Sequence, residues 1–111
     1  MYNRYNCIKD IIKIAKKMRN TLDYLVCSDD FFTVFDYDLC GLCAISSLAL
    51  QSIYKDEIQK NSEVYIGNFV EMDHCWLEID GFFIDITATQ FGIKSRVICV
   101  RKDSKFAQNN F

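Results

Sequence analysis

The stretch HCWLEIDGFFIDIT, residues 74–87, decides the fold. Two runs of apolar and aromatic residues flank Asp80-Gly81, a pair whose tolerance for positive φ favours a two-residue hairpin turn. In that register Ile79 faces Phe82 and Leu77 faces Ile84. One hairpin face is then apolar, and the other is predicted to carry His74, Trp76, Glu78, Phe83, Asp85 and Thr87.

The register makes His74 and Asp85 diagonal neighbours on one face, with Cβ atoms roughly 7 Å apart or less. A carboxylate bonded to one imidazole nitrogen fixes the tautomer and stabilises the cation that forms when the other nitrogen takes a proton. His74 is the only histidine in the chain, so imidazole-dependent chemistry must involve it. We therefore predict a base at His74 that Asp85 orients.

A thiol upstream supplies the candidate nucleophile. Small and branched residues recur at helical spacing from Gly41 to about Lys55, which predicts a largely buried helix with Cys43 in its first turn. A helix N-terminus favours the thiolate, and the N–H of Cys43 could donate to a developing oxyanion. Gly41 leaves room for a substrate to approach the backbone. A single buried cysteine is usually core filler, so the catalytic interpretation depends on the combination with His74 and Asp85.

The remaining patterns complete a single α+β domain over residues 1–111. An amphipathic helix is predicted over about residues 4–26, with its lysines and Arg19 on a solvated face. Strands are predicted at 63–70, 73–79, 82–86 and 96–101, followed by a polar tail over 103–111. The expected architecture is two helices packed on an antiparallel sheet of about four strands.

Composition narrows the classes of function. Half of the residues are hydrophobic and the net charge is -2, which predicts a globular domain and argues against nucleic acid as a partner. No apolar run approaches the roughly 20 residues that span a bilayer. The start of the chain lacks the features of a secretory signal, so we expect a cytoplasmic protein with free thiols, or one delivered into another cell by a dedicated secretion system. A disulfide framework and a zinc site using Cys40 and Cys43 are the alternatives, but a second cysteine pair is missing and no metal or cofactor is expected.

Two segments resemble the papain-like and transglutaminase-like cysteine enzymes. CGLCAIS, residues 40–46, is similar to the papain nucleophile segment, and residues 74–87 are similar to the His-x-Trp and Asp-x-Thr strands of compact members. The resemblance covers residues 39–91, about half of the chain. It implies a papain-like or transglutaminase-like core with Cys43, not Cys40, as the attacking thiol and with His74 and Asp85 completing a triad.

The departures from papain point to a smaller branch of that superfamily. Tyr37 stands where papain-type peptidases place their oxyanion glutamine, Ala44 replaces an aromatic residue, and Asp85 replaces an asparagine. Gln90 also resembles a family position, without an assigned role. These features resemble the deamidase-like branch, in which some bacterial effectors and toxins hydrolyse glutamine side chains of other proteins.

Two functions from different classes follow. The first is a cysteine-dependent hydrolase or acyl transferase acting on amide bonds of proteins or peptides through a thioester, as a peptidase, glutamine deamidase or transglutaminase. Trp76 and Gly41 would contact the substrate, although packing is the commoner role for a tryptophan. The second is a noncatalytic module that binds a protein partner through the aromatic residues within 31–37. The sequence does not indicate the substrate or the oligomeric state.

Overall fold

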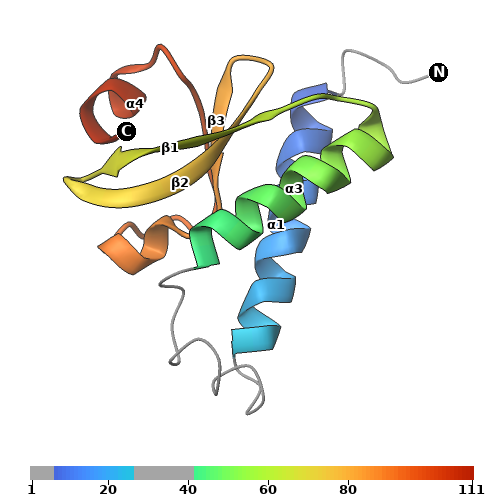
Figure 1. Cartoon of the computed structure of the whole chain (residues 1–111), viewed down its shortest axis with the longest axis horizontal. Helices are drawn as coiled ribbons and strands as arrows, with labels where there is room; N and C mark the ends of the chain where they lie inside the picture. The colour runs from blue at the N-terminus through green and yellow to red at the C-terminus, as the bar shows by residue number, and fades with distance from the viewer. Residues whose placement is uncertain (1–6, 27–41) are drawn as a thin grey trace.

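The structure is a computed structural model, which describes residues 7–26 and 42–111. Its elements in chain order are α1 (Cys7–Val26), α3 (Leu42–Ile58), β1 (Glu63–Phe69), β2 (Met72–Ile79), β3 (Phe82–Asp85), the 3₁₀ helix η2 (Ala88–Phe91), β4 (Ile98–Arg101) and α4 (Lys105–Asn110). The predicted α+β class with a four-stranded antiparallel sheet is confirmed (Figure 1). Gly41, Cys40 and residues 31–37, to which the sequence assigned roles, lie outside the described residues.

The four strands follow one another in the sheet in the order β1-β2-β3-β4. The predicted hairpin register is confirmed, because Ile79 pairs with Phe82 and Leu77 pairs with Ile84. Asp80 and Gly81 have φ values of 53° and 83°, the two left-handed residues that a type I′ turn requires. The right-handed twist of such a turn matches that of the strands it joins, so the local sequence is enough to set the pairing.

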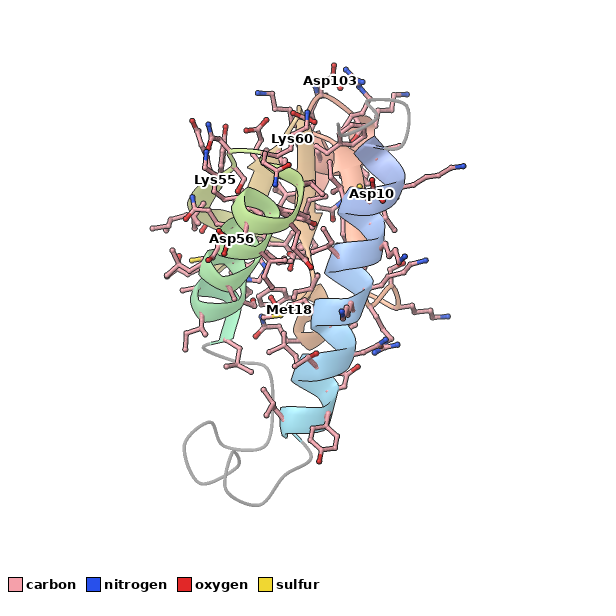
Figure 2. All side chains as sticks on the ribbon, turned by 90° about the vertical axis from the view of Figure 1, so that its right-hand side faces the viewer. Asp10, Met18, Lys55, Asp56, Lys60 and Asp103 are labelled. Atoms are coloured by element: carbon pink, nitrogen blue, oxygen red, sulfur yellow. The ribbon has the colours of Figure 1, made fainter. Side chains whose placement is uncertain are left out.

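Helices α1 and α3 cover one face of this sheet, as the two views together show (Figures 1 and 2). Their apolar residues recur every three or four positions and meet the face of β2 and β3 that carries Leu77, Ile79 and Ile84. The Tyr54 hydroxyl of α3 donates a 2.7 Å hydrogen bond to the carbonyl of Ile11 in α1. This bond fixes the two helices against each other inside the core.

The opposite face of the sheet carries an aromatic layer that α4 closes. The Phe111 ring lies 4.8 Å, centroid to centroid, from the rings of both Phe69 and Trp76. Ala107 of α4 is buried, and the Ser104 hydroxyl caps the helix by accepting the N–H of Ala107 at 3.2 Å. The prediction of a polar tail over 103–111 was therefore wrong. Ala107 and Phe111 are the apolar contacts of a helix too short to show a periodic pattern.

None of the helices within 7–26 and 42–111 is long and apolar enough to cross a membrane.

Candidate active site

His74 on β2 and Asp85 at the end of β3 meet on the aromatic face of the sheet, as the hairpin register predicted. His74 Nε2 and Asp85 Oδ2 are 2.6 Å apart, and the two side chains are 0% and 1% exposed. Burial of both partners excludes competing water, so the carboxylate holds the imidazole in one orientation.

Thr87 anchors the second oxygen of Asp85. Asp85 Oδ1 accepts the backbone N–H of Thr87 at 2.9 Å and its hydroxyl at 3.2 Å. Both carboxylate oxygens are thus occupied, and the acid cannot rotate away from the imidazole without breaking three hydrogen bonds. This role of Thr87 was not predicted from the sequence, although the Asp-x-Thr spacing is typical of a carboxylate that bonds the backbone two residues on.

Aromatic rings enclose the imidazole. The ring centroids of Phe91 and Phe69 lie 4.8 Å and 5.7 Å from that of His74, and Trp76 lies at 6.2 Å. Nδ1 of His74 is buried and finds no hydrogen-bond partner among the described residues. Because Nε2 is engaged by Asp85, Nδ1 is the nitrogen left for proton exchange.

Cys43 is the second residue of α3, half-buried in the first turn as predicted. Its thiol lies near that of Cys75 on β2, close enough to contribute to the raised pKa of the Cys75 thiol. Cys75 follows His74 directly on the strand and therefore points to the opposite, helix-covered face. Within the part of the chain that the structure describes, no hydrogen bond joins Cys43 to His74, so the histidine and the acid are brought together and the thiol lies beside the next residue of the strand.

The other described cysteines are poor nucleophiles. Burial, and then the neighbouring Cys43 thiol, raise the pKa of Cys75, and burial raises the pKa of Cys99 to about 11. Both side chains are therefore protonated at neutral pH, where a thiol has little nucleophilicity. Among the three described free cysteines, Cys43 alone combines a helix N-terminus with proximity to β2.

Trp76 is 4% exposed and packs between Tyr65, Phe83 and Phe111. Its indole Nε1–H has no acceptor among the described residues. The structure thus gives Trp76 a clear packing role, while its predicted contact with a substrate stays a prediction.

Arg19 is buried, contrary to the prediction from the sequence. It was predicted on a solvated face, but the structure leaves only 7% of it exposed. Its Nη1–H donates to the carbonyl of Ile86 at 2.6 Å and to the carbonyl of Arg96 at 3.3 Å. Ile86 lies between Asp85 and Thr87, so the guanidinium ties α1 to the segment that carries the acid of the pair.

Asp23 balances this buried charge. Its carboxylate accepts Nε of Arg19 at 2.9 Å and also pairs with Arg96. Burial by itself would raise the pKa of Asp23, but the hydrogen bonds from the two arginines outweigh it, so this pKa lies below its usual value.

Over residues 7–26 and 42–111, no three His, Cys, Asp or Glu side chains lie close enough together to hold a metal ion. Cys40, the partner of Cys43 in the zinc alternative, lies outside these residues.

Comparison with known proteins gave no matching family model, curated protein or solved structure. Any assignment of function therefore depends on the site itself.

Proposed function

We propose that the chain is a cysteine-dependent hydrolase or acyl transferase that acts on amide bonds of proteins or peptides, with Cys43 as nucleophile, His74 as base and Asp85 as the group that orients the base. The observation that carries the proposal is the buried His74–Asp85 pair, whose imidazole keeps Nδ1 without a partner among the described residues. A base whose one nitrogen is held by a carboxylate and whose other nitrogen makes no hydrogen bond is the arrangement that activates a thiol.

The reaction follows from these roles. Nδ1 of His74 takes the proton of Cys43, and the sulfur attacks the amide carbon to form a tetrahedral adduct. The imidazolium returns the proton to the leaving amine, and a thioester remains on Cys43. Water resolves the thioester in peptide cleavage or glutamine deamidation, and a substrate amine resolves it in transamidation, so the same three residues serve all three outcomes.

Catalysis requires the Cys43 sulfur to come within hydrogen-bond reach of Nδ1. The thiol lies near Cys75, whose side chain points to the helix-covered face of β2, whereas His74 points to the aromatic face. The approach therefore requires the first turn of α3 to move relative to this strand. Hydrogen bonds between catalytic groups are often long before a substrate binds and shorten in its presence.

Selective alkylation tests the proposal without knowledge of the substrate. Iodoacetamide labelling, followed cysteine by cysteine with peptide mapping, should modify Cys43 rapidly well below pH 8.5 and faster than Cys75 or Cys99. Asp85→Asn should slow Cys43 labelling by about tenfold at pH 6.5. The matched control is Asp73→Asn, an exposed acid on β2, which should leave the rate unchanged.

Equal labelling of all three thiols, or a Cys43 rate that ignores Asp85→Asn, would reject the enzyme and favour a noncatalytic binding module. Intact-mass measurement after incubation with candidate proteins then separates the reaction types, because deamidation, cleavage and crosslinking change mass differently. The Cys43→Ala chain should produce none of these changes.

A further inference from the structure

A cavity of about 450 Å³ opens between the second half of α1 and the segment that leads into β4. Six polar residues line it: Lys16, Arg19, Asn20, Lys94, Ser95 and Arg96. Its size lies within the range of sites that hold small ligands or single side-chain groups. Four of these six residues are cations and none is an acid, so the cavity is suited to an anion.

The two guanidinium groups of the cavity are held in place. Arg19 is fixed by the carbonyls of Ile86 and Arg96, and Arg96 donates to Asn20 Oδ1 at 2.7 Å and pairs with Asp23. Even when Asp23 is counted against them, the four cations leave a positive excess. Lys16 and Lys94 are exposed and form no ion pair with a described residue, so their ammonium groups are available to a ligand.

The positive surface continues beyond the cavity. Lys9, Lys13 and Lys16 follow one another at helical spacing on α1 and line a second hollow of about 330 Å³, and Lys16 belongs to both hollows. Nitrogen-tipped side chains project from the side of α1 that faces away from α3 (Figure 2). We call Lys9, Lys13, Lys16, Lys94 and Arg96 the basic track.

We propose that the basic track binds an acidic polypeptide segment, whose carboxylates lie along α1 and enter the cavity beside Arg19. An extended row of cations matches an extended row of acids better than it matches one compact ion. This inference rests on the proposed function in one respect, since it names the protein substrate as the source of the acidic segment.

Charge balance favours a peptide over a nucleic acid. The whole sequence has 13 Lys and Arg residues against 15 Asp and Glu residues, so a surface that gathers the five cations of the track together with Arg19 leaves the rest of the chain distinctly acidic. A long polyanion would meet that repulsive surface beyond the track, whereas a short acidic segment would not. The residues of the two hollows also include no aromatic ring on which a base could stack.

Fluorescence anisotropy with a labelled glutamate-rich peptide tests the proposal, with a glutamine-rich peptide of equal length as the control ligand. The Cys43→Ala chain is used, so that no turnover alters the peptide. We expect the glutamate peptide alone to bind, more weakly as salt is added. The double variant Lys16→Ala with Lys94→Ala should weaken binding by about tenfold.

The matched control is Lys55→Ala with Lys102→Ala, which removes the same charge from exposed lysines elsewhere and should leave the affinity within about twofold. Equal loss in both double variants, equal binding of the glutamine peptide, or tighter binding of a single-stranded oligonucleotide would each overturn the proposal. If the peptide binds but Cys43 shows no selective alkylation, the basic track is supported as a binding site and the proposed enzymatic function is rejected. If Cys43 is selectively alkylated but the peptide does not bind, the enzymatic function is supported and the binding site is rejected.

Discussion

Replacement of Arg19 by methionine should destabilise the chain more than replacement of an exposed charged residue does. Methionine keeps most of the apolar stem of the side chain and removes the guanidinium. The change leaves the carbonyl of Ile86 without its 2.6 Å donor and the carbonyl of Arg96 without its 3.3 Å donor. It also separates Asp23 from the better buried of its two arginine partners.

The magnitude follows from these contacts. Loss of a charged donor to a buried carbonyl costs about 2 to 3 kcal/mol, which applies to Ile86. The longer bond to Arg96 adds about 0.5 kcal/mol, and the part-exposed ion pair with Asp23 adds about as much. We therefore expect the free energy of unfolding to fall by about 3 to 4 kcal/mol, which for a domain of this size lowers Tm by about 12 to 16 °C.

Urea unfolding followed by the fluorescence of Trp76, the only tryptophan, measures the change directly. Arg96→Met is the control, because its side chain is 54% exposed and should cost less than about 1 kcal/mol. If the two variants unfold at the same urea concentration, Arg19 is not the tether of the Asp85 segment. In the folded Arg19→Met chain, broadened NMR signals of the single histidine would show that the loss reaches the His74–Asp85 pair.

Further predictions concern the turn, the aromatic layer and the thiols. Gly81→Ala should cost about 1 kcal/mol in urea unfolding, because φ is 83° there while an added Cβ would contact nothing. Phe111→Ala should cost about 2 kcal/mol and red-shift the tryptophan emission, because the half-buried ring covers the indole. The Cys99 pKa is raised from 9.0 to about 11 in the folded state, so unfolding should become easier as the pH rises through that window, and Cys99→Ala should reduce the fall.

Each of these has an outcome that contradicts it. A Gly81→Ala chain as stable as the parent would mean that the turn is not type I′. Unchanged emission in Phe111→Ala would place the ring away from the indole, with Phe106→Ala, an exposed neighbour on α4, as the control. An identical pH profile in Cys99→Ala would assign the alkaline loss to other groups, such as Tyr54, whose pKa burial also raises.

Local sequence was sufficient for the hairpin and for half of the site. The alternation of 74–87 and the Asp80-Gly81 turn fix the register by themselves, and the register brings His74 to Asp85. The helix that carries Cys43 was also predictable, because its buried residues recur at helical spacing. These features depend on neighbours within a few residues or across one tight turn.

The features that were missed depend on contacts between distant parts of the chain. A basic residue on an amphipathic helix is ordinarily solvated. Nothing near Arg19 in sequence indicates that the carbonyl of Ile86, 67 residues away, will accept a hydrogen bond from its guanidinium. Phe111 follows a polar segment, so only the folded structure shows that its ring packs against Phe69 and Trp76. The placement of the Cys43 thiol beside Cys75 likewise depends on how α3 crosses β2.

Gly67 on β1 links the edge of the sheet to the size of one ring on the next strand. A Cβ built at this glycine would lie 2.9 Å from the Cη2 atom of Trp76, so the indole occupies the volume that a side chain would need. The side chains at positions 67 and 76 therefore compete for the same volume. In related sequences, a larger residue at position 67 should therefore occur together with a smaller side chain at position 76. A larger residue at position 67 alone should displace the Trp76 ring, which lies beside His74.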